Sequence, residues 1–176
     1  MSTIIVMTGL PGSGKDTWIN NFLKSERGST YKVVSTDMYL EEIAKEEGLT
    51  YNDVFEERFR DAEKRMNAAV QVYVKEDVDV IWNQTNLGLK KRAKILNIFK
   101  KYENKFCISI IIDEDVHRQR LDARAEREGK TISESVIRKM NYDRVEPSLE
   151  EGFHSVMVLD TSGDTPELVS FTQVQH

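Results

Sequence analysis

Five short, mostly apolar runs recur along the chain, separated by longer and more polar stretches. They cover residues 4–8, 31–34, 78–82, 106–112 and 156–159. Continuous rather than alternating apolar runs are typical of strands buried on both faces of a parallel sheet. Strands that alternate with helical segments favour an α/β fold. We therefore expect a parallel β-sheet flanked by helices.

The stretches between these runs carry a helical pattern, which is clearest at 53–74. Apolar positions there follow a 4-3-4-3-4 spacing that lines one helix face, at Phe55, Phe59, Ala62, Met66, Ala69 and Tyr73. We interpret that face as core packing. Further helices are expected at 14–24, 38–45, 89–101, 115–128 and 133–142, the last one capped by Ser133.

Length and composition limit the overall organisation. A chain of 176 residues with 39% hydrophobic content can bury one substantial core, so we expect one domain over 1–176. No run approaches the ~18 apolar residues of a membrane span, and the N-terminus lacks the order of a secretion signal. These features predict a cytoplasmic protein that needs no membrane, and they leave its oligomeric state open.

Charge bears on the class of partner. The formal net charge of −5 argues against broad adhesion to nucleic acid, which relies on clustered Lys and Arg. A local basic channel stays open, because basic side chains gather at 90–94 and again at 118–130. A charge run on a helix is, however, usually a solvated face.

The strongest chemical signal directly follows the first strand, where the chain reads Gly-Leu-Pro-Gly-Ser-Gly-Lys-Asp-Thr. This pattern is a phosphate-binding P-loop, whose glycines allow backbone N–H groups to point at phosphate oxygens at the start of a helix. Lys15 supplies a cation for the β- and γ-phosphates. The predicted ATP-binding residues are Gly9, Pro11, Gly12, Ser13, Gly14, Lys15, Asp16 and Thr17.

The loop departs from the usual pattern at the metal position. The motif places Ser or Thr directly after the lysine to hold Mg²⁺, whereas this chain has Asp16 there and Thr17 one place later. Either Thr17 takes over the hydroxyl role, or Asp16 helps to hold Mg²⁺ directly or through water. We favour the water-mediated role of Asp16.

Polar residues after the second strand suggest a catalytic group. Asp37 ends the segment Val33-Val34-Ser35-Thr36-Asp37, at the strand end where ligands gather in open parallel sheets. A carboxylate so placed can accept the proton of an attacking hydroxyl during phosphoryl transfer. The competing interpretation is that Asp37 only caps the helix expected at 38–45.

The third strand also ends in polar residues. Gln84, Thr85 and Asn86 follow it and offer donors and acceptors suited to a phosphate or a sugar. A turn that satisfies its own backbone is the alternative, and for Asn86 the two interpretations are nearly balanced.

Three arginines share one face of the helix expected at 115–128. Arg120, Arg124 and Arg127 have i, i+4, i+7 spacing just before Gly129, as in a lid at roughly 115–142 that neutralises charge on a transferred phosphoryl group. Pairing with nearby acidic residues in an ordinary exposed helix is the alternative. We favour lid roles for Arg124 and Arg127, and leave Arg120 undecided.

Taken together, these segments resemble the P-loop polynucleotide 5′-hydroxyl kinases and the small phage-type kinases around them. The resemblance runs from about Ile4 to Leu159 and rests on Gly9–Lys15 with Thr17-Trp18, on Thr36–Tyr39, on Thr85–Leu87 with Lys91-Arg92, on the arginine-bearing lid, and on Glu146–Phe153. In addition, Ser13–Thr17 is similar to the P-loop of some phage deoxynucleoside monophosphate kinases.

The resemblance implies a P-loop NTPase/kinase fold and a role for each matching residue. Lys15 would be the phosphate clamp, Asp37 the general base, and Arg124 with Arg127 the lid cations. The acceptor side would comprise Tyr39, Gln84, Thr85, Asn86 and Arg92. This chain departs from the family at Leu40, where those kinases have an arginine that grips an acceptor phosphate, and at Gln84, where they have an acidic residue.

We therefore expect an enzyme, a kinase that uses ATP and Mg²⁺ to phosphorylate a hydroxyl of a nucleic acid or nucleotide. A polynucleotide 5′-hydroxyl kinase is the leading version. The alternatives are a kinase of a hydroxymethylated base in DNA, or of a nucleoside or deoxynucleoside monophosphate. A rival from another class is a regulatory protein that binds ATP without transferring phosphate.

Overall fold

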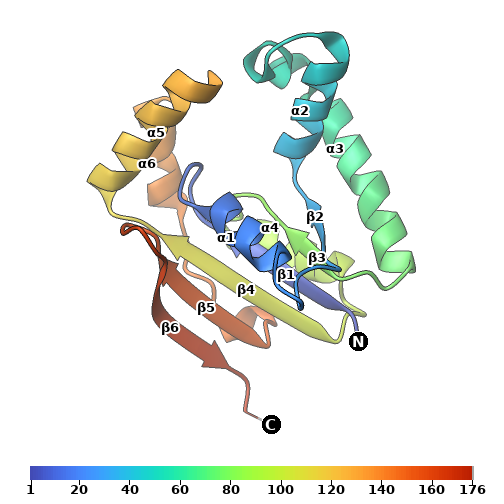
Figure 1. The fold of residues 1–176 in the computed structure, drawn as a ribbon. Coiled ribbons are helices and arrows are strands. Elements are labelled where there is room, and N and C mark those ends of the chain that lie inside the picture. The colour runs from blue at the N-terminus through green and yellow to red at the C-terminus, as the bar shows by residue number, and fades with distance from the viewer. Residues whose placement is uncertain (176) are drawn as a thin grey trace.

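The computed structural model describes residues 1–175 and has the expected alternation of strands and helices (Figure 1). The strands are β1 Thr3–Thr8, β2 Lys32–Val34, β3 Val80–Trp82, β4 Asn104–Ile111, β5 Ser155–Asp160 and β6 Glu167–Gln173. The helices are α1 Lys15–Leu23, α2 Thr36–Glu47, α3 Tyr51–Lys75, α4 Leu89–Ile98, α5 Glu114–Glu128 and α6 Glu134–Asp143, and a 3₁₀ turn, η1, spans Leu149–Glu151.

The strands form a single sheet in the order β2-β3-β1-β4-β5-β6. The first five in this order are parallel, and β6 alone pairs antiparallel, with β5. The prediction of a parallel α/β sheet is thus confirmed for the five apolar runs. It missed β6, because all of its residues are exposed and the strand carries no buried apolar run.

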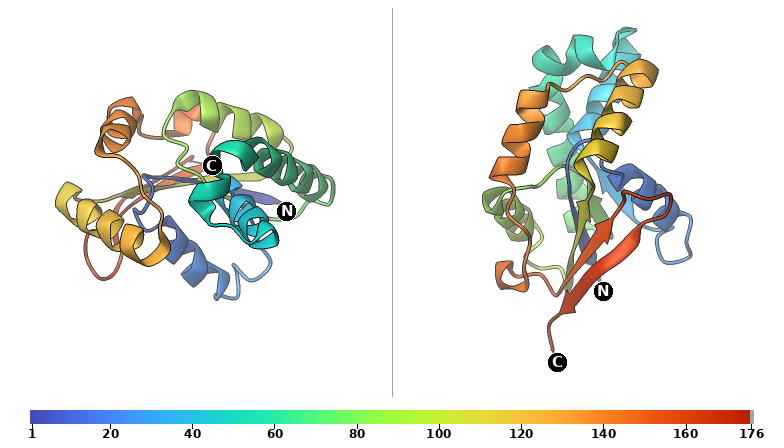
Figure 2. Two further views of the ribbon diagram at one scale, coloured as in Figure 1. Left: turned by 90° about the horizontal axis from the view of Figure 1, so that it is seen from above. Right: turned by 90° about the vertical axis from the view of Figure 1, so that its left-hand side faces the viewer.

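Helices cover both faces of the sheet (Figure 2). Ile4 and Val6 of β1 belong to the core under α3 and α4, whereas Ile5 and Met7 pack on the other face, with Ile19 of α1. This alternation follows from the opposite directions of successive side chains in a strand. Cys107 is buried in the first of these cores, and burial raises the pKa of its thiol, in keeping with a structural role.

Two helical arms rise beyond the carboxyl ends of the strands (Figure 1). One arm consists of α2 with the first turns of α3. The other is the lid, which we define as α5, α6 and the connection 129–133. Among residues 1–175, no helix is both long enough and apolar enough to cross a membrane.

The apolar face of α3 does not serve the core along its whole length. Ala62 and Met66 are buried, but Phe55 is 41% exposed and Phe59 is half-buried. Instead, Val54 faces the α2 core. The interpretation of this face as core packing is therefore wrong for Phe55, whereas Phe59 packs against the α2 core.

Leu40 and Tyr39 of α2 turn toward α3. Leu40 is fully buried in a cluster with Ile43, Ala44 and Val54, and Tyr39 packs partly buried against that cluster. An acceptor-binding role for Tyr39 is therefore not supported by its placement. An arginine at position 40 would meet the same apolar cluster.

Arg92 is also placed inside the fold, which contradicts its expected role as an acceptor contact. Its side chain is fully buried and makes a bidentate ion pair with Glu151, at 2.7 and 3.1 Å. It also donates to the carbonyls of Asn86 and Leu87, both at 3.0 Å. Arg92 therefore ties α4 to η1 and holds the loop after β3.

Replacing Arg92 by Ala should destabilise the fold strongly, because Glu151 would remain buried without its partner. We expect the free energy of unfolding to fall by about 3–5 kcal/mol, measured by urea denaturation. Arg65→Ala is the matched control. Its pair with Glu46 is also bidentate but exposed, so its loss should lower the free energy of unfolding far less than the loss of Arg92. Equal losses in the two variants would contradict this assignment.

Candidate functional site

Two adjoining chambers lie between the arms, beyond the ends of β1, β2 and β3. The P-loop chamber, of about 880 Å³, is lined by Pro11, Gly12 and residues 14–17, by α2, and by three arginines of α5, Arg120, Arg124 and Arg127. The α3 chamber, of about 620 Å³, is lined by the start of α3 and by residues of the lid. They share Pro11, Ser35, Asp37, Asn83, Gln84, Thr85, Arg124 and Lys130. The shared wall makes them two halves of one site.

The P-loop leaves the start of α1 open. Gly14 precedes the helix with a φ of 104°, a left-handed conformation that glycine adopts without strain, and no side chain caps the helix there. By contrast, a side chain caps each of α2, α3, α5 and α6. The first N–H groups of a helix have no partner within it. Those of α1 therefore face the chamber as an anion site.

Lys15 lies folded over the loop that it follows. Its Nζ donates to the carbonyls of Gly9 and Leu10, at 2.8 Å each, and its side chain is buried. Burial lowers the pKa of Lys15 to about 8, although the nearby carboxylates of Asp16 and Asp37 act in the opposite direction. The fraction of Lys15 that is a neutral amine is thus ready to gain a proton when phosphate approaches.

Three further contacts, which the sequence did not reveal, hold the P-loop in shape. His117 of α5 makes a hydrogen bond to the Pro11 carbonyl, at 2.7 Å, and Thr161 donates to the Ser13 carbonyl, at 2.5 Å. A Cβ on Gly12 would lie 2.9 Å from a methyl group of Leu121. The lid helix therefore packs directly on the phosphate loop, and Gly12 permits this close approach.

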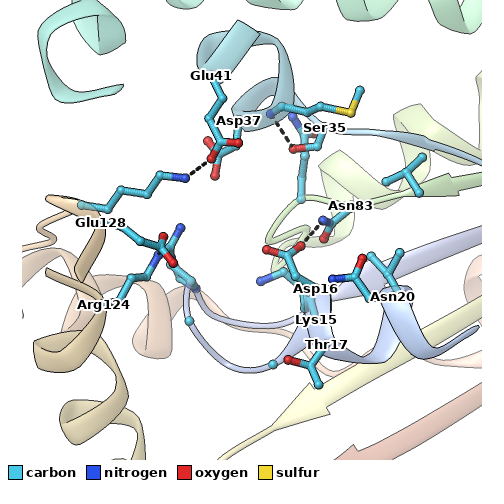
Figure 3. A pocket seen from close by; sticks show the side chains of 18 of the residues that line it. Lys15, Asp16, Thr17, Asn20, Ser35, Asp37, Glu41, Asn83, Arg124 and Glu128 are labelled. Carbon is cyan, nitrogen blue, oxygen red and sulfur yellow. Dashed lines mark hydrogen bonds and ion pairs between the residues drawn. The ribbon is translucent and has the colours of Figure 1, made fainter. Parts of the chain in front are cut away.

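Asp16 and Asn83 provide the oxygen atoms suited to a metal. The Asn83 amide donates to Oδ1 of Asp16, at 2.7 Å, while the Asn83 oxygen is buried and unpaired. Figure 3 shows Thr17 pointing away from both Asn83 and Asp37. Carboxylate and amide oxygens fit Mg²⁺, which keeps several waters. Within residues 1–175 no group of three His, Cys, Asp or Glu gathers that could hold a metal ion.

Asp37 is free to face the cleft because another residue caps its helix. α2 begins at Thr36, and the Ser35 side chain accepts from the Met38 N–H at 3.3 Å. The alternative that Asp37 only caps the helix is therefore wrong. Its Oδ1 accepts a hydrogen bond from the Tyr51 hydroxyl, at 2.7 Å. Figure 3 shows Asp37 above Lys15 and Asp16, across the cleft from Arg124.

Of the polar residues after β3, two line the chambers and one is buried in the fold. Thr85 and Gln84 line both chambers, and Gln84 bridges Thr36 and Trp82 at 2.5 and 2.9 Å. Asn86 is fully buried, has a positive φ of 46°, and donates to the Met7 carbonyl at 2.7 Å. An acceptor contact by Asn86 is therefore excluded by this geometry. The alternative of a turn that satisfies its own backbone does not describe Asn86 either, because its amide donates to β1, 79 positions away.

The lid arginines take three different positions. Arg124 lines both chambers with its side chain 18% exposed, whereas Arg127 is 69% exposed at the edge of the P-loop chamber. Glu128 pairs with both, at 3.3 and 3.0 Å, and the hydrogen bond from Arg127 lowers the pKa of its carboxyl. Arg120 instead donates to the carbonyls of Thr161 and Gly163. Arg124 is therefore the best placed of the three over the site.

The connection between α5 and α6 contacts the opposite arm. Gly129 ends α5 with a φ of 67°, and its carbonyl accepts from the Asn52 side chain. Lys130 pairs with Glu41 of α2 and lies 4.5 Å from the centre of the Tyr51 ring. The lid and the α2–α3 arm thus meet above the cleft.

Comparison with known proteins gives a family match over most of the chain. The family described as AAA domain matches residues 4–147. Heterogeneous nuclear ribonucleoprotein U-like protein 2 of Homo sapiens is 28% identical over 142 residues, which is 78% of this chain. The chain spans only 19% of that protein's length.

Solved structures share the fold at low sequence identity. The Pnkp1/Rnl/Hen1 RNA repair complex aligns with a TM-score of 0.64 and 23% identity, over 81% of this chain and 43% of that chain. Kti12 of Chaetomium thermophilum in complex with ADP-AlF3 aligns with a TM-score of 0.61 and 21% identity, over 92% of this chain and 90% of that chain. A sugar kinase of Janibacter sp. HTCC2649 aligns with a TM-score of 0.59 and 17% identity, over 91% of this chain and 86% of that chain. These similarities establish a P-loop kinase-like fold.

Binding of MgATP should draw a proton to Lys15. With a pKa of about 8 in the free protein, half of the Lys15 side chains are neutral at pH 8, and phosphate favours the charged form. We expect uptake of about half a proton at pH 8 and about a tenth at pH 7, measured by calorimetry in buffers of different ionisation enthalpy. Lys15→Arg, which stays charged, should bind without uptake. Equal uptake in both proteins would assign the proton elsewhere.

Proposed function

The chain belongs to the AAA domain family, and from that premise we propose that it is a kinase that transfers the γ-phosphoryl group of ATP to a hydroxyl of a nucleic acid or nucleotide. One observation carries the proposal. Asp37 stands on the wall shared by the two chambers, with the P-loop on one side and the α3 chamber on the other. A base so placed can serve an acceptor in one chamber and a phosphate donor in the other.

In this mechanism the protein mainly positions groups and neutralises charge. The open N-terminus of α1 and Lys15 bind the phosphate tail, and Arg124 faces the same chamber from the lid to balance charge that develops during transfer. Asp37 takes the proton from the attacking hydroxyl. Mg²⁺, held by Asp16 and Asn83 with water, would supply further neutralisation of the phosphate oxygens.

The α3 chamber supports an acceptor with a planar ring. Tyr51, Phe55 and Phe59 form an aromatic row along α3, with successive ring centres 5.6 and 5.7 Å apart. Ile132, Val136 and Met140 of the lid line the same chamber. Aromatic side chains can stack on any nucleobase. This lining supports a nucleobase next to the hydroxyl that is phosphorylated.

A polynucleotide 5′-hydroxyl is the acceptor we put first, and the shared fold with a protein of an RNA repair complex supports it. Against a long polyanion stand Asp53, Glu56 and Glu57, which also line the α3 chamber. Those carboxylates favour a smaller acceptor, such as a nucleoside or a deoxynucleoside monophosphate. A hydroxymethylated base in DNA is the remaining alternative.

Incubation with labelled ATP and a panel of acceptors tests the proposed function. The panel contains 5′-hydroxyl DNA and RNA, DNA with hydroxymethylated bases, nucleosides and monophosphates. Transfer to one class identifies the acceptor. Tight binding of ATP without transfer to any member would instead support a nucleotide-binding regulator, for which the unusual Asp16 gives a physical basis.

Replacing Asp37 by Asn should lower kcat by about 100-fold or more, because a positioned base is removed. ATP binding should persist, since the P-loop is unchanged. Asp61→Asn is the matched control, because Asp61 lies further along α3 in an exposed pair with Arg58. Turnover that survives in Asp37→Asn would remove Asp37 from the mechanism.

Replacing Phe55 by Ala should raise the KM for the acceptor about tenfold, since base stacking on an aromatic ring contributes roughly 1–3 kcal/mol. The KM for ATP should stay within about twofold. Val72→Ala on the same helix is the control, because Val72 is 49% exposed and lies outside both chambers. Unchanged acceptor kinetics in Phe55→Ala would place the acceptor elsewhere.

A further inference from the structure

Tyr51 is the residue that holds the Asp37 side chain. It is the first residue of α3, directly after Thr50, which caps the helix in a reciprocal capping box with Asp53. The Tyr51 hydroxyl donates to Oδ1 of Asp37 across the gap between α3 and α2. Within residues 1–175, the other carboxylate oxygen, Oδ2, makes no hydrogen bond. One oxygen is thus anchored, and the other is left for a substrate hydroxyl.

The electrostatic setting keeps Tyr51 a donor. Burial raises the pKa of its hydroxyl far above the usual value, and the neighbouring Asp37 carboxylate raises it further. The phenol therefore stays protonated throughout the working range of pH. A neutral phenol that donates to a carboxylate fixes the direction of that carboxylate.

The lid reaches this pair through Lys130. The Lys130 ammonium lies over the face of the Tyr51 ring, within the distance of a cation–π interaction, and also pairs with Glu41. The contact between Asn52 and the Gly129 carbonyl holds the neighbouring residue of the lid. Every contact here joins the lid connection to the start of α3 or to α2.

We infer that Tyr51 is a positioning residue for Asp37, and that Lys130 makes this positioning depend on docking of the lid. The inference rests on the proposed function, in which Asp37 is the base. A lid that moves off α3 takes Lys130 away from the Tyr51 ring and loosens the contact between Tyr51 and Asp37. The base is then fully oriented only when Arg124, on the same lid, also faces the P-loop chamber.

Tyr51→Phe tests whether Tyr51 positions Asp37, because the substitution removes the hydroxyl and keeps the ring. We expect kcat to fall about tenfold or more, as for loss of a hydrogen bond to a charged group, with the KM values for ATP and acceptor within about threefold. In an Asp37→Ala background the same change should have no further effect. An effect confined to the KM for the acceptor would overturn the positioning role. An equal fall of kcat in the wild-type and the Asp37→Ala backgrounds would overturn it as well.

Tyr102→Phe is the matched control. It also removes a tyrosine hydroxyl, one that donates to the carbonyls of Val78 and Tyr73 at 2.6 and 3.2 Å, in the core and outside both chambers. It should lower thermal stability and leave kcat unchanged. An equal fall of kcat in Tyr102→Phe would mean that general destabilisation explains the effect of Tyr51→Phe.

Lys130→Gln tests whether the positioning of Asp37 depends on the lid. We expect kcat to fall about threefold to tenfold, and to change less than twofold when Tyr51 is already Phe. Lys139→Gln makes the same charge change on α6, where Lys139 pairs with Asp143, and should leave kcat unchanged. Independent, multiplicative losses from Lys130→Gln and Tyr51→Phe would show that Lys130 acts on substrate directly, against the inference.

A readout without activity separates this inference from the proposed function. A crystal structure of the wild type should show the Asp37 carboxylate hydrogen-bonded to the Tyr51 hydroxyl. A crystal structure of Tyr51→Phe should show the Asp37 carboxylate in a different orientation. If no acceptor is phosphorylated, the proposed function fails while this comparison still decides the positioning role. An identical Asp37 orientation in both structures would overturn the inference even in an active enzyme.

Discussion

The site depends on one constraint, which is that the first N–H groups of α1 remain unpaired. A helix start without a side-chain cap is ordinarily unfavourable, and here it is kept because the surrounding chain fixes the loop from outside. His117 and Thr161 hold its carbonyls, and Lys15 folds onto two others. All of these bonds use the carbonyl side of the loop. The N–H groups at the start of α1 therefore stay available for an anion, whereas the N–H groups of Gly9 and Ser13 already bond to the carbonyls of Thr85 and Leu10.

The same constraint explains why the lid is close to the phosphate loop. His117 and Leu121 belong to α5, the helix that carries Arg120, Arg124 and Arg127. Anchoring of α5 on the P-loop places its arginine face along the P-loop chamber, and the connection at 129–130 then spans the cleft to the arm formed by α2 and α3. The geometry of the phosphate site and the closure of the cleft are thus parts of a single packing arrangement.

The polar residues that the sequence singled out either face the chambers or lie buried inside the fold, and no sequence pattern separates the two groups. Asp37 and Thr85 face the chambers, whereas Asn86 and Arg92 are buried and bond to backbone carbonyls near β1 and β3. A buried polar group must find partners within the fold, and these two satisfy loops that would otherwise leave carbonyls unpaired. The residues that the sequence did not single out, Tyr51 and Lys130, come from segments 14 and 93 positions away from Asp37 along the chain.

The sequence by itself determined the local features. Apolar runs specified the five parallel strands, periodicity specified the helices, and the Gly-rich loop with Lys15 specified a phosphate site, because these depend on near neighbours along the chain. It could not reveal β6, whose exposed residues lack a burial pattern. Only the tertiary structure decided which side of each helix meets the cleft. It turned Leu40 and Tyr39 inward, exposed Phe55, freed Asp37 by giving the cap to Ser35, and brought the lid to Tyr51, since those outcomes depend on how distant elements pack.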